Sequence, residues 1–535
     1  MTRTIRLRPW QKAAFDAYVA ADGPDFLAVA TPGAGKTTFA LAAARYTLGE
    51  RPGRLVVVAP TAHLKIQWAH AADAVGLYLD PAWSPAAGPA ADLHGIVTTY
   101  QQVASAAPAL RALATGSLVI FDEIHHAADE RAWGDSIRLA FGAADRRLAL
   151  SGTPFRSDTS PIPFVDYVLD EARPDYTYGY GDALRDGRVV RPVYFPRVGG
   201  DMEWVAPDGA AVAASFDDAL DAPRSAQRLR TALSLDGQWL PTVLRSAHER
   251  LTAIRLTDPD AGGLVIATDQ DHARGIAEMM RWRLRVDPVV VTSDDPIASA
   301  RIARFGAGRD PWLVAVRMVS EGVDIPRLAV GVYATTTTTE LFFRQAVGRF
   351  VRWRRGGVRQ QAFLYLPDDP RLRARAFQIA DERRHSLRRD GRADDEPAMD
   401  GAFDELADTE RHPSLFSVIS AVATDHEEPD APWDVDLQPA DDAEGEHGFE
   451  LELADPPRLA PAPSGAPGVT LVEHKRQLRD SNSTVARELV HVTGWPHARV
   501  NAELNRRAGI TRVTQATAEQ LERRLRHAES WLRRA

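Results

Sequence analysis

The distribution of apolar residues divides most of the chain into two series of short buried strands. Within the first 390 residues, runs of four to seven apolar and β-branched residues alternate with longer Ala-rich stretches. Continuous apolar strands that alternate with helices indicate parallel sheets covered by helices on both faces. The pattern therefore predicts an α/β protein with two parallel-sheet lobes in tandem. The runs are residues 26–30, 55–59, 95–99, 118–121 and 148–151 in the first series, and 263–268, 288–292, 312–316, 328–334 and 362–366 in the second.

The remaining stretches differ from the strand pattern and set the domain boundaries. The predicted parts are a first lobe over 1–195, a mainly helical connector over 196–260, a second lobe over 261–390, an acidic and largely disordered linker over 391–470, and a basic helical domain over 471–535.

The linker prediction depends on charge. Residues 391–470 carry 21 acidic and 3 basic residues and are rich in Pro and Gly. Such a stretch cannot bury enough apolar surface to offset the entropy of ordering it. A specific acidic interaction site is the alternative. The apolar island at 414–424 is expected to form one docked helix, and a chain that ends near residue 390 is expected to keep both lobes.

Composition excludes several classes of protein. The chain of 535 residues has no cysteine, so disulfides and thiolate metal sites are excluded. It has no run of 18 apolar residues and no apolar signal core at its N-terminus, which predicts a soluble protein without a membrane partner. The net charge of −9 does not argue against nucleic acid, because the acidity is concentrated in the linker.

A Gly-rich run between Ala30 and Thr37 follows an apolar strand and opens an Ala-rich helix. This is the context that a phosphate-binding loop requires. Gly33 and Gly35 allow the backbone to curl so that its N–H groups and the helix N-terminus hold polyphosphate. Lys36 would reach the β- and γ-phosphates, and the Thr37 hydroxyl would ligate Mg²⁺. The alternative is an unrelated Gly-rich turn.

Two carboxylates, Asp122 and Glu123, follow the predicted strand at 118–121. Ligands of open parallel sheets bind outside the carboxyl ends of the strands. Asp122 would face the Mg²⁺ beside Thr37, and Glu123 would orient and deprotonate an attacking water. Without the phosphate loop, a turn with a helix cap would be the better interpretation. His125 or His126 would couple this site to the second lobe, or the pair would bind a metal, for which no third ligand is evident.

Seven motifs in order resemble those of the superfamily 2 helicases, the DEAD/DEAH-box-like nucleic-acid motors, over about residues 1–370. The resemblance implies that both lobes are RecA-like and that ATP and Mg²⁺ are cofactors. The motifs are LRPWQ (7–11), APTAHLKIQW (59–68), TTYQ (98–101), DEIH (122–125), SGTPFR (151–156), SEGVDIP (320–326) and QAVGRFVR (345–352).

The same resemblance implies roles for individual residues. Gln11 would read adenine, and Arg349 and Arg352 would be arginine fingers that join Lys36, Asp122 and Glu123 in catalysis. The last motif departs from the family at Ala346, where arginine is usual, and at Val351, where glycine is common. Neither departure removes a catalytic group, so an active ATPase is expected. The implied nucleotide contacts are Gln11, Thr31, Pro32, Gly33, Ala34, Gly35, Lys36, Thr37, Thr38, Gly322, Asp324 and Gln345.

The segment TYGYGDALRDGRVVRPVYF (177–195) resembles the group that contains restriction-type translocases and phage repair helicases, which act mostly on duplex or branched DNA. The predicted function is therefore an ATP-dependent DNA helicase or translocase, cytoplasmic and nucleoid-associated when bound to DNA. An RNA-dependent ATPase and a non-hydrolysing nucleic-acid scaffold are the alternatives. Lys65, in the second motif, would contact phosphate or be an exposed helix charge.

The basic tail is predicted to be a small three-helix bundle, with helices ending at Gly494 and Gly509 and a capping box at 517–520. It could bind DNA as a helix-turn-helix or dock a protein partner, and both remain open. Its last helix has Leu521, Leu525, Ala528 and Leu532 at core spacing, and a predicted basic face of Arg523, Arg524, Arg526, Arg533 and Arg534.

Overall fold

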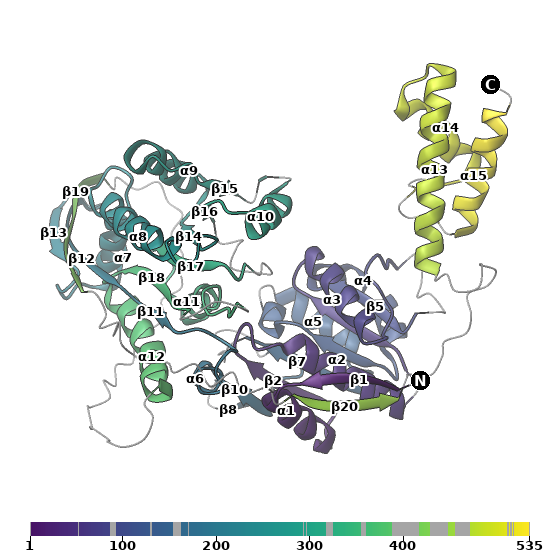
Figure 1. The fold of residues 1–535 in the computed structure, drawn as a ribbon, viewed down its shortest axis with the longest axis horizontal. Coiled ribbons are helices and arrows are strands. Elements are labelled where there is room, and N and C mark those ends of the chain that lie inside the picture. Colours follow the sequence, from purple (N-terminus) through teal and green to yellow (C-terminus); the bar gives the residue numbers. More distant parts are fainter. Residues whose placement is uncertain are drawn as a thin grey trace.

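The computed structural model places two α/β lobes side by side, with a separate helical module beside the first lobe (Figure 1). None of its described helices has the length and apolar content needed to span a membrane. The structure describes residues 2–51, 53–85, 93–128, 131–152, 162–168, 171–292, 294–295, 297–316, 325–354, 360–387, 417–427, 448–454, 471–510, 513, 516 and 518–533.

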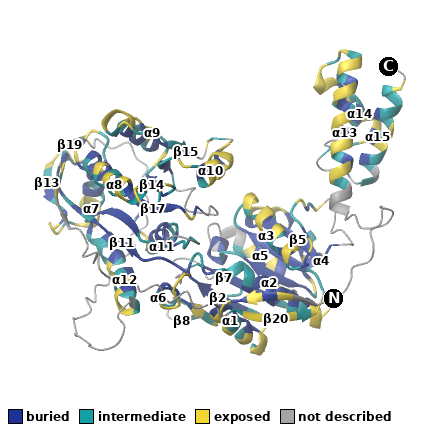
Figure 2. Ribbon diagram, in the orientation of Figure 1, coloured by how far each residue is buried: buried dark blue, intermediate teal, exposed yellow. Residues whose placement is uncertain are grey.

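The first lobe is a seven-stranded parallel sheet in the order β10-β2-β7-β6-β3-β5-β4. Its central strands are buried along their whole length, which explains their uninterrupted apolar sequences (Figure 2). The strands are β2 (Asp25–Ala30), β3 (Leu55–Ala59), β4 (Leu79–Asp80), β5 (Gly95–Thr99), β6 (Leu118–Phe121), β7 (Arg146–Ser151) and β10 (Tyr176–Tyr178). The helices are α1 (Pro9–Ala20), α2 (Lys36–Glu50), α3 (Ala62–Ala74), α4 (Tyr100–Ala114), α5 (Arg131–Phe141) and α6 (Tyr180–Arg185), with a 3-10 turn η1 (Ile124–Ala128) and a short hairpin of β8 (Tyr167–Val168) and β9 (Glu171–Ala172).

The second lobe is a nine-stranded sheet whose centre is parallel, in agreement with the predicted α/β class. Its strands are β11 (Val193–Tyr194), β12 (Arg197–Val205), β13 (Ala211–Ser215), β14 (Gly262–Ala267), β15 (Val289–Val291), β16 (Trp312–Ala315), β17 (Leu328–Ala334), β18 (Ala362–Pro367) and β19 (Ser417–Glu427). Its helices are α7 (Ala222–Ala232), α8 (Trp239–Arg255), α9 (Gln270–Met279), η2 (Met280–Leu284), α10 (Ala298–Ala307), α11 (Glu340–Val347) and α12 (Pro370–Leu387).

The prediction of a mainly helical connector over 196–260 is wrong in its first half. β12 and β13 form an antiparallel hairpin that extends the second sheet, and only α7 and α8 are helical. Val198, Gly200, Met202 and Trp204 are buried, and the alternate residues 199, 201 and 203 are more exposed. This alternation is the period of a strand with one buried face. The stretch belongs to the second lobe, because its strands continue that lobe's sheet.

The acidic stretch also contains regular structure. β19 pairs antiparallel with β12 at the edge of the second sheet, so the docked helix predicted at 414–424 is a strand over its described part. Ala421 on β19 is buried in the core of that lobe. β20 (Phe449–Ala454) pairs antiparallel with β1 (Thr2–Leu7) on the first lobe. The other residues of 391–470 lie outside the described part of the chain.

The β1–β20 ribbon is attached to the first lobe by apolar packing and by a hydrogen bond from Arg45. β1 is not a member of the seven-stranded sheet, and β20 is its strand partner. Leu451 and Leu453 are half-buried against the first-lobe core, and Nη2 of the buried Arg45 donates to the Leu453 carbonyl at 3.0 Å. A chain that ended near residue 390 would therefore lose one strand from each lobe, contrary to the expectation that both lobes are complete there.

The C-terminal module consists of α13 (Leu471–Thr493), α14 (His497–Ala508) and α15 (Ala518–Leu532). Gly509 ends α14 in the left-handed conformation that favours glycine. Arg524 is not on the predicted basic face, because its side chain is buried. The capping residue Thr517 and Arg534 lie outside the described residues. The Arg524 guanidinium donates to the side-chain oxygens of Asn482, Asn501 and Asn505 at 2.9, 2.6 and 2.9 Å.

The module begins close to the first lobe. Burial raises the pKa of Asp80 on β4, and the nearby cations Lys475 and Arg479 of α13 oppose that rise. The start of α13 therefore lies within electrostatic reach of the first-lobe sheet.

We expect replacement of Leu451 and Leu453 together by Ser to weaken the β1–β20 ribbon by about 2 kcal/mol, because each leucine is half-buried. The matched control replaces Glu450 and Glu452, which are exposed on the same strand. Hydrogen exchange of the β1 amides measures the opening free energy. Equal exchange in the two double variants would contradict the assigned packing.

Candidate functional site

The predicted phosphate loop forms between β2 and α2. Gly33 and Gly35 have φ of 85° and 97°, which requires glycine or a strained residue. Lys36 is the first residue of α2, so its side chain extends from the helix N-terminus. The predicted nucleotide contacts of this lobe thus lie on one continuous curve of backbone, namely Thr31, Pro32, Gly33, Ala34, Gly35, Lys36, Thr37 and Thr38.

The LRPWQ motif supports this loop. Gln11 Nε2 donates to the Gly35 carbonyl at 2.8 Å, and Trp10 Nε1 donates to the Ala34 carbonyl at 3.2 Å. The Gln11 amide oxygen accepts from the Arg8 N–H at 2.8 Å. Trp10 stacks on Tyr178 of β10, with ring centroids 4.8 Å apart. Gln11 therefore holds the loop in place, and adenine recognition by this residue stays a prediction.

Glu123 and Lys36 form the central ion pair of the site. Lys36 Nζ lies 2.8 Å from Glu123 Oε1, and Glu123 Oε2 accepts from the Gly152 N–H at 2.8 Å. The backbone of Glu123 has φ of 49°, which is unusual for a residue with a side chain and turns this carboxylate toward the loop. Burial raises the pKa of Glu123, but the Lys36 ammonium, together with the neighbouring His125, outweighs burial and lowers this pKa to about 2.

Asp122 has a different environment, although it is the adjacent residue. Its Oδ2 accepts from Trp68 Nε1 at 2.8 Å. Burial and the neighbouring Glu123 charge raise the pKa of Asp122 to about 6. A buried carboxylate held by a neutral indole is suited to a divalent cation, which would supply the opposite charge. Trp68 was missed as a site residue, because nothing in the sequence of its motif indicates a bond to Asp122.

The chemistry of these groups fits magnesium held mainly by phosphate. Among the described residues, no three His, Cys, Asp or Glu side chains gather into a metal site. Mg²⁺ is often bound through one or two protein oxygens together with substrate phosphates and water. Asp122, with the Thr37 hydroxyl at the start of α2, matches that pattern. The alternative of a two-histidine metal site at His125 and His126 has no support in the described residues.

Gly152 closes the site from the strand side. A β-carbon built on Gly152 would lie 3.1 Å from Lys36 Nζ, 3.3 Å from Glu123 Oε1 and 3.4 Å from Pro32 Cγ. A larger residue would press against the ion pair, so the glycine of the SGTPFR motif has a steric reason. Residues 153–156 of that motif lie outside the described part of the chain.

His125 joins the two lobes. Its Nε2 lies 3.0 Å from Gln345 Nε2 on α11, and its Nδ1 lies 3.4 Å from Ser151 Oγ. The side chain is 5% exposed. The structure thus brings His125 of the first lobe onto Gln345 of the last motif, which is the arrangement that interlobe coupling requires.

The end of α11 lies directly on the phosphate loop. A β-carbon built on Gly348 would lie 2.7 Å from Pro32 Cγ, and one built on Gly33 would lie 3.1 Å from both Cδ and Nη1 of Arg352. The structure therefore brings Arg352 to the loop, and Arg349 lies immediately after Gly348 in the same turn.

The two departures from the family's last motif have packing roles. Ala346 and Val351 are buried in the apolar cluster that runs between the lobes. Gly322 and Asp324 of the preceding motif lie outside the described residues, so their predicted contact with nucleotide is not addressed by the structure.

The structure contradicts one of the two roles predicted for Lys65, because this residue is not an exposed helix charge. Its side chain is 7% exposed, and Nζ donates to Gln102 Oε1 at 2.9 Å. Burial lowers the pKa of Lys65. The bond connects α3 to α4 and so ties the APTAHLKIQW motif to the residue that follows TTYQ.

Comparisons with known proteins give this chain a family model over its first lobe and full-length relatives. Residues 4–156 match the family model described as the type III restriction enzyme, res subunit. The chain is similar to the uncharacterized protein MT2985 of Mycobacterium tuberculosis, at 42% identity over 97% of this chain and 92% of that protein. It is also similar to the uncharacterized protein ML1624 of Mycobacterium leprae, at 40% identity over 97% and 93%.

Solved structures are matched at lower identity. A fragment of a putative HsdR subunit of a type I restriction enzyme from Vibrio vulnificus is 18% identical, with a TM-score of 0.46 over 67% of this chain and 63% of that chain. The type ISP restriction-modification enzyme LlaBIII bound to DNA is 14% identical, with a TM-score of 0.45 over 68% and 27%.

Proposed function

Because the chain belongs to the superfamily 2 helicases, in one family with the mycobacterial proteins, we propose that it hydrolyses ATP between its lobes to translocate on or remodel duplex or branched DNA. One observation carries this proposal. The phosphate loop, the Asp122–Glu123 pair and Arg352 of the opposite lobe meet at a single place. A scaffold that only binds nucleotide would not need Glu123 or the arginines there.

The first lobe would bind the nucleotide. The loop N–H groups and Lys36 would hold the triphosphate, Thr37 and Asp122 would hold Mg²⁺, and the ion would offset the charge that develops on the phosphates. Lys36 is bonded to Glu123 in the structure. When Lys36 turns to the γ-phosphate, the Glu123 carboxylate becomes free to accept a proton from the attacking water.

The second lobe would complete the site. Arg349 and Arg352 would stabilise charge on the transferring phosphoryl group, and Gln345 would sense the first lobe through His125. Loss of the γ-phosphate would remove a group that both lobes contact, and the lobes would separate. Repetition of this cycle on a bound strand would move the protein along nucleic acid.

Nucleic acid would be held mainly through its phosphates, so that affinity depends little on sequence. The C-terminal module would add contacts through three exposed arginines, Arg523 and Arg526 on α15 and Arg533 directly after it. Docking of a protein partner is the alternative role for this module.

Side-by-side ATPase assays test the proposal. We expect turnover to be lowest without nucleic acid and highest with duplex or forked DNA. Stimulation by RNA alone would favour an RNA-dependent ATPase instead. ATP binding without turnover under any of these conditions would favour the scaffold.

Replacement of Glu123 by Gln should leave ATP bound and lower steady-state turnover by about 10²- to 10⁴-fold, because the proposed proton acceptor is lost. Glu50→Gln, at the exposed end of α2, is the matched control and should turn over like the wild type. An ATP-binding titration run with the assay separates binding from chemistry. Normal turnover in Glu123→Gln would rule out this role.

Replacement of Arg523, Arg526 and Arg533 by Gln should weaken duplex DNA binding and reduce the slope of log affinity against log salt by up to about 0.9 for each lost phosphate contact. Arg506→Gln is the control, because Arg506 of the same module lies 2.8 Å from Glu503, a closer ion pair than the one of 3.9 Å between Arg526 and Glu522. Titration of labelled DNA at several salt concentrations gives both slopes. Coincident slopes for the triple variant and the wild type would favour the protein-docking role.

A further inference from the structure

We propose that Arg191 is the positioning residue that holds the arginine-finger loop (349–352) of the second lobe against the phosphate loop of the first. The inference rests on the proposed function, since it gives Arg191 a role in the same ATP site. Arg191 itself would not touch the nucleotide. It would act through Arg352, the finger whose side chain lies against the phosphate loop at Gly33.

Arg191 holds the finger loop through hydrogen bonds to the backbone carbonyls of that loop. Its Nε donates to the Phe350 carbonyl at 2.6 Å, and its own N–H donates to the Val351 carbonyl at 2.9 Å. The preceding residue, Val190, forms an antiparallel bridge with Arg352. Residues 350–352 of the finger loop are therefore fixed by two consecutive residues, Val190 and Arg191, of the segment that joins the lobes.

The same guanidinium also contacts SEGVDIP, the other motif of the second lobe. Its Nη2 donates to the carbonyls of Leu328 and Pro326, and Pro326 is the last residue of SEGVDIP. A single side chain thus connects the end of SEGVDIP to the end of QAVGRFVR. The resemblance to the superfamily 2 helicases implies that both motifs supply nucleotide contacts from the second lobe.

The segment that carries Arg191 is also attached to β2, the strand that leads into the phosphate loop. Tyr178 pairs with Ala30 at the end of β2, and its carbonyl accepts from the Thr31 N–H at 2.9 Å. Two residues later, the Tyr180 hydroxyl donates to the Arg191 carbonyl at 3.3 Å and accepts from the Val193 N–H at 2.9 Å.

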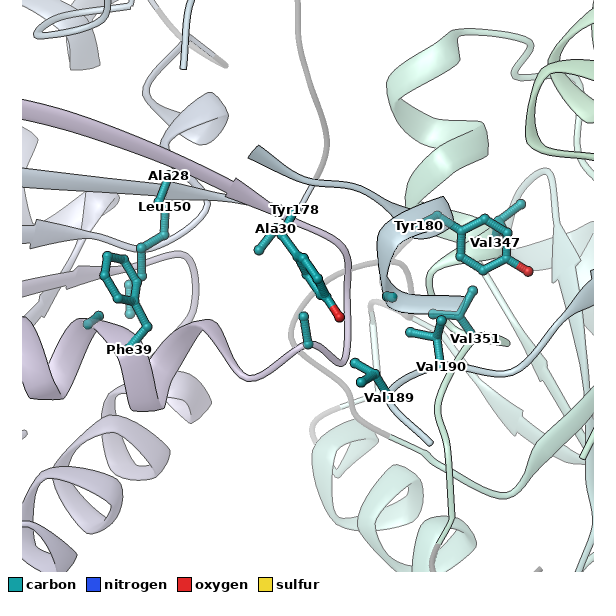
Figure 3. Packing of buried hydrophobic residues seen from close by; sticks show 14 of the residues in the cluster. Ala28, Ala30, Phe39, Leu150, Tyr178, Tyr180, Val189, Val190, Val347 and Val351 are labelled. Carbon is teal, nitrogen blue, oxygen red and sulfur yellow. The ribbon is translucent and has the colours of Figure 1, made fainter. Parts of the chain in front are cut away.

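The packing along this path is continuous. Figure 3 shows Tyr178 beside Ala30, and Tyr180, Val189 and Val190 beside Val347 and Val351 of the second lobe. The side chain of Arg191 is 2% exposed. Residues 178–191 therefore form a short bracket between the phosphate loop and the fingers, and its buried contacts come from 178, 180, 183–184 and 189–191.

Arginine is suited to this position and lysine is not. A buried cation is costly unless it is hydrogen-bonded, and the planar guanidinium offers five N–H donors in a fixed fork. This fork serves carbonyls on two separate loops at once. An ammonium group at the end of a flexible stem would keep the charge but could not fix both loops in one geometry.

The test is a double-mutant cycle in the full chain. Arg191→Lys should lower ATP turnover at saturating ATP and DNA by about 10²-fold, the scale of a misplacement near 1 Å, with ATP affinity changed less than about threefold. In an Arg352→Ala background the same substitution should cost less than about threefold, because the finger through which it acts is already absent. If the turnover losses of Arg191→Lys and Arg352→Ala multiply in full in the double variant, the proposal is wrong.

Arg228→Lys is the matched control. Arg228 is a buried arginine on α7 of the second lobe. It donates to the carbonyls of Ser215 and Asp218, away from the ATP site. It should retain wild-type turnover for each folded molecule. An equal loss in Arg228→Lys would mean that Arg191 acts only through general stability, and the proposal would be wrong.

Two measurements keep the inference testable if Arg191→Lys folds poorly or if activity is absent. Tyr180→Phe, which removes the hydroxyl that holds Arg191, should lower turnover severalfold, and this loss should also vanish in the Arg352→Ala background. Hydrogen exchange of residues 345–352 should be faster in the Arg191 and Tyr180 variants than in Arg228→Lys. Faster exchange with no ATPase in any protein would overturn only the proposed function, whereas unchanged exchange would overturn the bracket.

Discussion

The contact between the phosphate loop and the end of α11 is the constraint on which the site depends. Pro32 and Gly348 can meet because Gly348 has no side chain, and Arg352 reaches the loop because Gly33 has none. A β-carbon at Gly348 would press on Pro32 of the opposite lobe, and one at Gly33 would displace the Arg352 side chain by a few tenths of an ångström. The nucleotide site is therefore a property of the interface, and each lobe holds only part of its chemistry.

The adjacent acids show how this interface sorts two similar groups. Glu123 faces the cation Lys36 and keeps a low pKa, whereas Asp122 faces a neutral indole and has a raised one. The left-handed backbone at Glu123 is what separates the two side chains. A small local strain thus places one carboxylate where a water could be activated and the other where a metal ion could bind.

Sequence patterns predict the local parts of this structure well. The continuous apolar strands, the phosphate loop and the acidic pair each follow from residues that are close together in the chain. The misses are non-local. β19 and β20 lie in a segment whose mean composition is that of a linker, and only their partners β12 and β1 make them strands. The position of Arg524 among other arginines predicts a basic surface, but its guanidinium is buried and donates to three asparagines from other parts of the module.

The place of β20 has a mechanical consequence. The chain leaves the second lobe after β19, returns to the first lobe as β20, and only then enters the helical module. The module therefore follows, along the chain, a strand of the lobe that carries the phosphate loop, and Lys475 and Arg479 lie near Asp80 of the same lobe. If the lobes separate and close as proposed, the module would keep its position relative to the first lobe, and the second lobe would move relative to both.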